Sequence, residues 1–146
     1  MYKNNCSSCT AWGTIFSAWL IACLATLGSL FFSEIMKFPP CVLCWYQRIC
    51  MYPLVVVLLA GLFPVSKSVV KFSLPLVLVG WIIAIYHNLL YYNIISDSLA
   101  PCLQGISCTA VYIEWMGFIT IPFLSLIAFT AILILLLVTH KELSHE

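Results

Sequence analysis

Charged residues are scarce in this sequence, and their scarcity excludes most soluble folds. Only 8% of the 146 residues are Asp, Glu, Lys or Arg, whereas soluble domains carry about a quarter. So few charges cannot cover a water-soluble globule of this length, and lipid must therefore solvate much of its surface. The sequence also lacks internal repeats at solenoid periods, low-complexity tracts and any basic stripe, so it offers no basis for nucleic-acid binding.

Long apolar runs take the place of charge, and 64% of the residues are hydrophobic. Four runs approach or exceed the roughly 20 residues that a helix needs to cross the hydrocarbon. They lie at residues 13–33, 45–63, 72–92 and 115–139. Their continuous hydrophobicity favours helices over the alternating strands of a membrane barrel. The sequence therefore predicts an all-α membrane protein, with one domain over residues 1–146 that forms a four-transmembrane-helix bundle.

The first run needs to be distinguished from a signal peptide. It is longer than a typical signal-peptide hydrophobic region, and residues 34–37 (Glu-Ile-Met-Lys) do not form a small-residue cleavage site. We therefore predict that the first run is retained as a span.

Basic residues set the expected orientation of the spans. The N-terminus, the second loop and the C-terminus hold four lysines, whereas the other two loops hold only Lys37 and Arg48. The four are Lys3, Lys67, Lys71 and Lys141. Because cytoplasmic loops carry the excess of Lys and Arg, both termini are predicted to be cytoplasmic. The loops at residues 34–44 and 93–114 would then lie on the extracytoplasmic face of a multi-pass cell-membrane protein.

Two pairs of cysteines belong to these two external loops. Cys41 and Cys44 stand where the first external loop enters the second span, and Cys102 and Cys108 stand in the third loop. All four would face an oxidising compartment, where disulfides persist. A disulfide across two intervening residues closes too small a loop to stabilise the fold much. Such a pair is more typical of redox chemistry, and a helix beginning near Cys44 would favour a thiolate.

Other interpretations of the cysteines remain open. Two structural disulfides would brace the short loops. A tetrathiolate zinc site is a further alternative, but the five residues between Cys102 and Cys108 exceed the usual spacing of two to four, so no metal is predicted. Cys23 and Cys50, within apolar spans, are expected to behave as small buried hydrophobic residues. The remaining two cysteines, Cys6 and Cys9, are predicted to form a free cytoplasmic dithiol without an assigned role.

Polar side chains near the first pair add to the redox interpretation. Arg48 follows Cys44 by one helical turn near the membrane boundary, where an arginine either snorkels to water or acts on a ligand. It is placed to hold a thiolate or to donate hydrogen bonds to a quinone carbonyl, and Gln47 adds a neutral donor and acceptor. His87 and Asn88, near the outer end of the third span, are candidates for function or for helix packing.

The stretch Pro40-Cys-Val-Leu-Cys-Trp-Tyr-Gln-Arg48 resembles the signature of the DsbB family, membrane proteins that regenerate disulfide-donating partners by passing electrons to quinone. Ser29-Leu-Phe-Phe-Ser-Glu34 and Gly117-Phe-Ile-Thr-Ile-Pro-Phe123 look most like the BdbC branch of that family. The resemblance covers about residues 15 to 138. The Cys6-Ser-Ser-Cys9 segment is not part of the signature, and the third loop is shorter than in some members.

The resemblance implies a thiol:quinone oxidoreductase that supports disulfide bond formation. Electrons would pass from an extracytoplasmic thioredoxin-fold disulfide oxidase, similar to DsbA or BdbD, to Cys102 and Cys108. They would continue to Cys41 and Cys44 and then to a membrane quinone, either ubiquinone or menaquinone. These four cysteines are the predicted catalytic residues. The predicted cofactor-binding residues are Arg48, Gln47 and His87.

Two other functions compete with this one. An enzyme of the vitamin K epoxide reductase type also uses a Cys-x-x-Cys pair beside a quinone, although the Trp-Tyr-Gln-Arg run favours the DsbB family. A non-enzymatic four-helix membrane scaffold with disulfide-braced loops is the alternative from another class. Bound quinone and a reducible Cys41–Cys44 bridge would distinguish an enzyme from a scaffold, which needs neither.

Overall fold

A computed structural model of the chain describes residues 3–37, 39–65, 67–94 and 120–144, with side chains from residue 9 onward. Four helices and no strand are present in these ranges. They are α1 (Lys3–Leu30), which continues into the π-helical turn η1 (Phe31–Ile35), α2 (Val42–Ala60), α3 (Lys67–Tyr91) and α4 (Ile121–Ser144). All four are long and apolar enough to cross a membrane. The predicted all-α, four-helix membrane fold is therefore confirmed.

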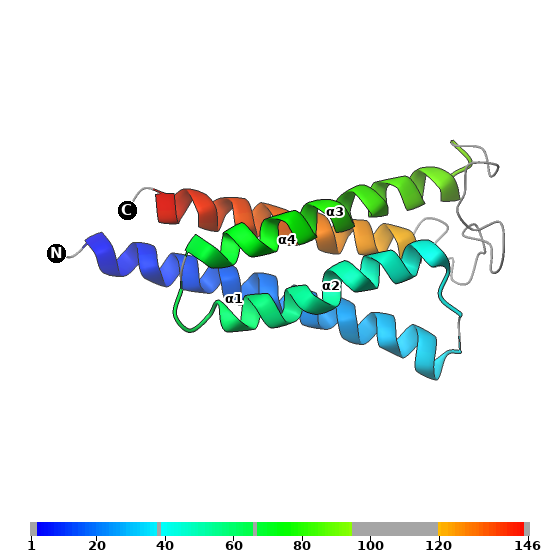
Figure 1. Cartoon of the computed structure of the whole chain (residues 1–146), viewed down its shortest axis with the longest axis horizontal. Coiled ribbons are helices and arrows are strands. Elements are labelled where there is room, and N and C mark those ends of the chain that lie inside the picture. Colours follow the sequence, from blue (N-terminus) through cyan, green and yellow to red (C-terminus); the bar gives the residue numbers. More distant parts are fainter. Residues whose placement is uncertain (1–2, 38, 66, 95–119, 145–146) are drawn as a thin grey trace.

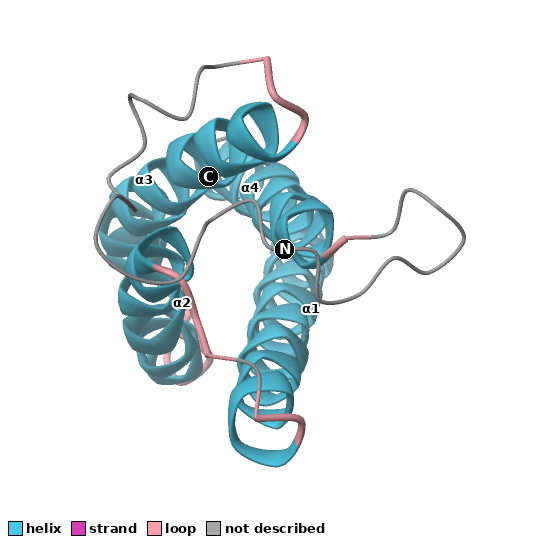
Figure 2. Cartoon of the chain, turned by 90° about the vertical axis from the view of Figure 1, so that its right-hand side faces the viewer, coloured by secondary structure: helices cyan, strands magenta, loops and turns pink. Residues whose placement is uncertain are grey.

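The helices form an antiparallel bundle in which neighbours in the chain pack side by side (Figure 1). α1 packs against α2 and α4, and α3 packs against the same two helices. Seen end-on, the four helices are arranged around a common axis (Figure 2). The beginning of α1 and the end of α4 lie at one end of the bundle, and the connection from η1 to α2 lies at the other. This arrangement keeps the two chain ends on the same side, as an even number of spans requires.

Small and apolar side chains hold the helices together. Ala18, Ala22 and Ala84 are fully buried in the main core, and Gly80 on α3 leaves room for the ring of Phe129 on α4. Small residues let helix backbones approach closely in a membrane, where the solvent is as apolar as the side chains. Hydrogen bonds between helices add to this packing. The hydroxyl oxygens of Thr14 on α1 and Thr139 on α4 lie 2.7 Å apart. The indole N–H of Trp81 on α3 donates to the hydroxyl of Thr130 on α4 at 3.0 Å.

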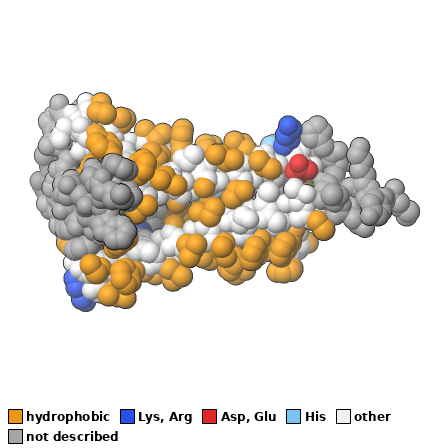
Figure 3. Space-filling model, turned by 180° about the vertical axis from the view of Figure 1, so that it is seen from behind, with side chains coloured by type: hydrophobic (Ala, Val, Ile, Leu, Met, Phe, Trp, Pro, Cys, Tyr) orange, Lys and Arg blue, Asp and Glu red, His pale blue; other side chains and the backbone are white. Residues whose placement is uncertain are grey.

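The outer surface of the bundle is apolar along its length. Large hydrophobic side chains are exposed on every helix, for example Leu27, Val56, Ile82 and Ile134. In the space-filling view, hydrophobic atoms cover the middle of the molecule and the visible charged side chains stand near its ends (Figure 3). Exposure of these side chains to water would be unfavourable, but a lipid bilayer solvates them. This surface accounts for the scarcity of charge in the sequence.

Two helix ends set the position of the cysteine pair. Two prolines precede Cys41, whose extended backbone (φ −70°, ψ 169°) makes it the residue that caps the start of α2. α3 ends where Asn93 adopts a left-handed conformation (φ 55°), and its N–H and that of Ile94 donate to carbonyls of the last turn, both at 3.0 Å. Asparagine tolerates this conformation better than most residues. The first turn of α2 and the last turns of α3 therefore meet at one end of the bundle.

Candidate functional site

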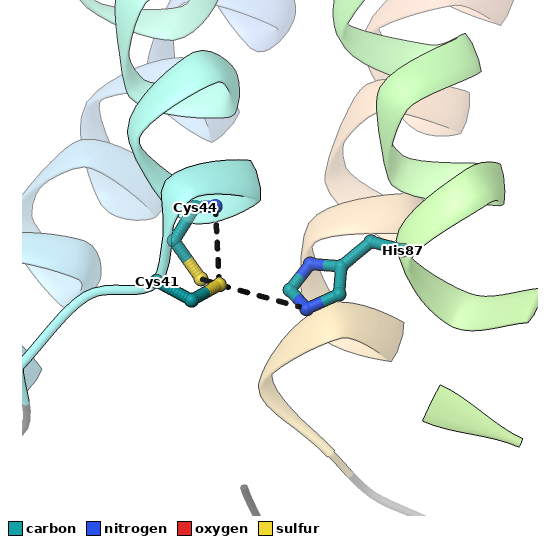
Figure 4. A group of neighbouring side chains, drawn as sticks. All are labelled: Cys41, Cys44 and His87. Atoms are coloured by element: carbon teal, nitrogen blue, oxygen red, sulfur yellow. Dashed lines mark hydrogen bonds between the residues drawn. The ribbon is translucent and has the colours of Figure 1, made fainter. Parts of the chain in front are cut away.

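Cys41 and Cys44 lie side by side at the N-terminus of α2. Their Sγ atoms lie 3.0 Å apart, and both thiols are free. The backbone N–H of Cys44 donates to Cys41 Sγ at 3.4 Å, so the sulfur occupies the position of a helix-capping acceptor (Figure 4). The partial positive charge of a helix N-terminus favours an anionic sulfur there. The local fold of α2 therefore stabilises a thiolate at Cys41.

His87 reaches the pair from α3. Its Nε2 lies 3.8 Å from Cys41 Sγ, and its Nδ1 lies 3.3 Å from the side-chain amide nitrogen of Gln47 on α2. His87 is only 2% exposed and Gln47 is 8% exposed. The imidazole therefore lies between the Gln47 amide and the Cys41 sulfur, with one ring nitrogen near each. Figure 4 shows the side that faces Cys41.

These contacts lower the pKa of the Cys41 thiol to about 4, far below the usual range for cysteine. The hydrogen bond with the Cys44 side chain is the largest cause. Burial raises the pKa, whereas His87 lowers it by a hydrogen bond and by its charge. The interactions that favour the anion outweigh the burial that opposes it. Cys41 is therefore a thiolate at neutral pH when the pair is reduced.

Alkylation of Cys41 should reveal this low pKa. In the folded, reduced protein its reaction rate with iodoacetamide is expected to stay nearly constant between about pH 6 and about pH 8, because the thiolate is fully formed above its pKa. In the unfolded chain the rate is expected to rise about tenfold per pH unit until it nears the ordinary thiol pKa of about 8.5. Mass spectrometry of the Cys41 peptide measures both rates. A tenfold rise per pH unit in the folded protein would contradict the assignment.

Arg48 lies one turn after Cys44 and is held by α1. Its Nε donates to the Ser29 hydroxyl and its Nη2 donates to the Ser29 carbonyl oxygen, both at 2.8 Å. The guanidinium carbon is 5.5 Å from the centre of the Trp45 ring, within the range of a cation–π contact. No ion pair of Arg48 occurs within the part of the chain that the structure describes. The guanidinium is thus fixed in place while its positive charge remains available to a ligand.

A cavity of about 490 Å³ joins these groups. Residues of all four helices line it, and most of the lining is apolar. Its polar wall includes Cys41, Cys44, Gln47, Arg48 and His87. The lining also includes Leu24 on α1 and Leu124 and Ile127 on α4, which are exposed on the outside of the bundle. The cavity therefore extends from the cysteine pair to the lipid-facing surface.

The structure brings five of the seven predicted site residues to this cavity, namely the five just named. Cys102 and Cys108 lie outside the described residues.

Three other cysteines of the described residues do not line the cavity. Cys9 is free and exposed, and Cys50 is buried in the core. Cys23 is only partly buried, in contrast to the buried position expected for it. Asn88 donates from Nδ2 to the carbonyls of Ala84 and Pro122 at 2.8 and 2.9 Å, so its amide joins α3 to α4.

Two residues of the cavity wall were not singled out from the sequence. The hydroxyl oxygens of Thr26 on α1 and Tyr52 on α2 are buried and have no hydrogen-bond partner within the described structure. A polar residue inside an apolar run is a candidate for function, so that signal was available for Thr26. Tyr52 continues the spacing of Cys44 and Arg48 along α2, four residues at a time, and so shares their face of the helix.

Comparisons with known proteins identify the family to which the chain is related. The family model described as "Disulfide bond formation protein DsbB" matches residues 11–139. Disulfide bond formation protein C of Bacillus subtilis (strain 168) is 47% identical over 130 residues, which cover 89% of this chain and 94% of that protein. Probable disulfide formation protein C 1 of Bacillus anthracis is 46% identical over 118 residues, which cover 81% of this chain and 85% of that protein.

A more distant relative is the probable disulfide formation protein of Metapseudomonas resinovorans, 37% identical over 132 residues, or 90% of this chain and 92% of that protein. No solved structure matches the chain. The family model spans α2, α3, the cysteine pair and most of α1 and α4. The chain belongs to the DsbB family of disulfide bond formation proteins.

Proposed function

We propose that the chain is a membrane thiol:quinone oxidoreductase that reoxidises a dithiol partner and so supports disulfide bond formation. The observation that carries this proposal is the position of the Cys41/Cys44 pair on the wall of a mostly apolar cavity that extends to the lipid-facing surface. A lipid-soluble oxidant can reach such a site from the membrane. A scaffold has no use for a low-pKa thiol beside a ligand-sized cavity.

The proposal includes an orientation and a partner. Both termini would lie in the cytoplasm, and the end of the bundle that holds the cysteine pair would face the extracytoplasmic side of the cell membrane. Lys67, Lys71 and Lys141, near the end of the bundle where the chain begins and ends, support this orientation by the positive-inside rule. The partner would be a soluble extracytoplasmic thioredoxin-fold oxidase of the DsbA or BdbD kind, because an external dithiol pair must be reached from outside.

Thiol–disulfide exchange would carry the electrons to the cavity. A partner thiolate attacks Cys102, which breaks the Cys102–Cys108 disulfide and frees Cys108. Cys108 attacks Cys41 and releases Cys44 as a thiolate. After the partner completes its own disulfide and frees Cys102, Cys102 attacks Cys108 and releases Cys41. Each exchange conserves the number of disulfides, so two electrons now reside on the Cys41/Cys44 dithiol.

The described residues fit a quinone as the final acceptor. A bound quinone would supply a sink for two electrons, which the Cys41 thiolate and the Cys44 thiol give up as their disulfide re-forms; Cys44 would release one proton, and the second proton of the quinol would come from outside the pair. Quinone carbonyls accept hydrogen bonds, and the cavity offers donors in Arg48, Gln47 and the two unpartnered hydroxyls. Arg48 would stabilise negative charge near Cys44, and His87 would exchange a proton with the Cys41 sulfur. The apolar part of the cavity wall would hold the quinone ring and exclude water.

The unpartnered hydroxyl of Tyr52 provides one test of this fit. Tyr52→Phe removes only the hydroxyl, so KM for quinone is expected to rise by about two- to tenfold, the value of one neutral hydrogen bond. Tyr46→Phe is the matched control, since Tyr46 lies on the same helix, is exposed and does not line the cavity. Steady-state quinol formation at varied quinone concentration measures both. Equal KM values in the two variants would remove Tyr52 from the binding site.

Arg48 should contribute more than the hydroxyls. Arg48→Met removes the only Lys or Arg side chain among the described lining residues, and quinone reduction is expected to fall by about a hundredfold, as for loss of one preorganised donor to developing negative charge. Arg48→Lys keeps the charge but cannot make both contacts to Ser29, and it is expected to recover part of the rate. Lys37→Met controls for loss of a cation at the same end of the bundle. An unaffected rate in Arg48→Met would leave Arg48 with a structural role.

The experiment that tests the function is a quinone reduction assay. Purified protein in lipid nanodiscs is supplied with a reduced thioredoxin-fold partner and either ubiquinone or menaquinone, and quinol formation is followed by absorbance. Wild type is expected to reduce at least one quinone, and Cys102→Ser is expected to stop partner-driven turnover. Activity that survives in Cys102→Ser would mean that the partner reaches Cys41 directly, which refutes the relay. Inactivity of wild type with both quinones and several partners would favour a scaffold.

A further inference from the structure

Three metal-ligating side chains converge at the cysteine pair. The Sγ atoms of Cys41 and Cys44 and a ring nitrogen of His87 all lie within 4.8 Å of one another (Figure 4). Disulfide exchange needs only the two sulfurs, and the nitrogen of His87 that would exchange a proton with Cys41 is the one placed to ligate a metal ion beside them. We propose that the reduced Cys41/Cys44 pair and His87 bind a thiophilic divalent metal ion, with Zn²⁺ as the best match, and that the bound ion holds the pair in an inactive reduced state.

The geometry is close to that of a tetrahedral site. Zn–S bonds of about 2.3 Å and Zn–N bonds of about 2.0–2.1 Å place the ligand atoms of such a site about 3.4–3.8 Å apart. Here the two sulfurs are 3.0 Å apart and Cys41 Sγ is 3.8 Å from His87 Nε2. Side-chain shifts of about 1 Å would therefore place these three atoms at three corners of a tetrahedron around the ion. Cys-x-x-Cys at a helix N-terminus is also the usual spacing for two zinc-binding thiolates.

Gln47 supports the metal-binding form of His87. Metal-ligating histidines usually direct their second ring nitrogen to a hydrogen-bond partner, which fixes the ring and its tautomer. The Gln47 side-chain amide lies 3.3 Å from His87 Nδ1. With its amide oxygen turned to that nitrogen, Gln47 accepts the Nδ1 proton and leaves the Nε2 lone pair directed at the sulfurs. As placed, the amide nitrogen of Gln47 faces Nδ1, and a 180° flip of the amide, which moves no other atom, gives the tautomer that a metal site requires.

Charge and oxidation state determine when the ion can bind. Two thiolates neutralise a divalent ion, so the complex adds no net charge to a site of low polarity beside the membrane. Three protein ligands leave the fourth position open to a small ligand from the cavity. Only the reduced pair offers thiolates, because a disulfide has none. Zn²⁺ is not redox-active, and sulfurs bound to it can neither attack a disulfide nor give up electrons. Binding would therefore stop the cycle reversibly at its reduced stage.

Metal binding can be measured without any quinone. The full chain is reduced, freed of quinone and reductant in detergent, and titrated with Co²⁺, whose thiolate charge-transfer and d–d absorption bands report tetrahedral sulfur coordination. We expect one bound equivalent of Co²⁺, displaced by Zn²⁺, and none in the oxidised protein.

Cys41→Ser is expected to abolish the bands, and His87→Ala is expected to weaken Co²⁺ binding by more than about tenfold. Gln47→Leu is expected to weaken it about tenfold with unchanged bands. Cys9→Ser and Cys102→Ser are the matched controls and should retain the site.

Several outcomes would overturn the proposal. Bands that persist in Cys41→Ser and vanish in Cys102→Ser would place the ion on the other cysteine pair. Equal affinity in wild type and His87→Ala would describe a two-sulfur site without the histidine. Size-exclusion chromatography checks the fold of each variant, and His87→Gln replaces His87→Ala if the latter does not fold. Zn²⁺ is also expected to protect Cys41 and Cys44 from alkylation until it is removed with EDTA, a readout that holds even if quinone reduction fails.

Discussion

Cys44→Ser is expected to lower partner-driven quinone reduction by about a thousandfold or more, the loss typical of removing a reacting nucleophile. A serine oxygen cannot form a bridge to Cys41 and cannot give up electrons, so the dithiol that stores the electron pair no longer exists. The substitution is nearly isosteric at a partly buried position in the first turn of α2, and the helix should remain folded. Quinol formation in nanodiscs measures the loss, and far-ultraviolet circular dichroism confirms the fold.

The same helix supplies a matched control for this experiment. Cys50 lies on α2, is buried in the core and does not line the cavity. Cys50→Ala is therefore expected to reduce quinone at a rate close to that of wild type, with at most a small loss of stability. Cys41→Ser should match Cys44→Ser, because both sulfurs are needed for the bridge. Substantial turnover in either of the two serine variants would refute the assignment of electrons to this pair.

Gly80→Ala is expected to have the largest effect on stability. A β-carbon at Gly80 would lie closer to the ring of Phe129 than any carbon–carbon contact allows. The ring cannot swing away freely, because Phe129 is 1% exposed in the main core between α3 and α4. Overpacking of this kind costs about 1–3 kcal/mol of unfolding free energy. Thermal unfolding of the detergent-solubilised protein, followed by circular dichroism, should therefore show a lower midpoint.

Two further variants isolate the cause of that destabilisation. Gly13→Ala is the matched control on α1, since a β-carbon there meets nothing within 4 Å. It should leave stability unchanged or raise it, because alanine favours a helix over glycine by about 1 kcal/mol. Phe129→Leu should relieve the clash when combined with Gly80→Ala, with a favourable coupling of about 0.5–3 kcal/mol between the two sites. Equal midpoints for Gly80→Ala and Gly13→Ala would contradict the close packing of α3 on α4.

The helices could be predicted from the sequence because hydrophobicity alone determines them. In the described residues each apolar run contains a helix, and the helix ends differ from the run ends because they depend on local chemistry. α1 begins at Lys3, before its apolar run, since nothing in the polar N-terminal segment breaks a helix. α3 ends near Asn93, where a left-handed residue stops it. α4 continues to Ser144, past the run that was predicted to end at residue 139.

The candidate site was only partly predictable for a physical reason. Cys41, Cys44 and Arg48 are close in sequence, so helical spacing relates them. The contact between His87 and Cys41 spans 46 residues and depends on how α3 is rotated about its axis, which a continuously apolar sequence does not determine. The same holds for the hydrogen bonds from Arg48 to Ser29. Arg48 is anchored to a neighbouring helix beside the cavity, and its binding of a ligand stays a prediction.

The exposed side of the cavity has a kinetic consequence. Leu24, Leu124 and Ile127 are both cavity lining and outer surface, so an apolar ligand would enter sideways from the bilayer. The quinone would then reach the cavity by lateral diffusion in the plane of the bilayer. The rate would follow the mole fraction of quinone among the lipids, not its amount per volume of buffer. Diluting the bilayer with inert phospholipid at constant total quinone should therefore slow turnover, because it lowers the mole fraction of quinone in the bilayer.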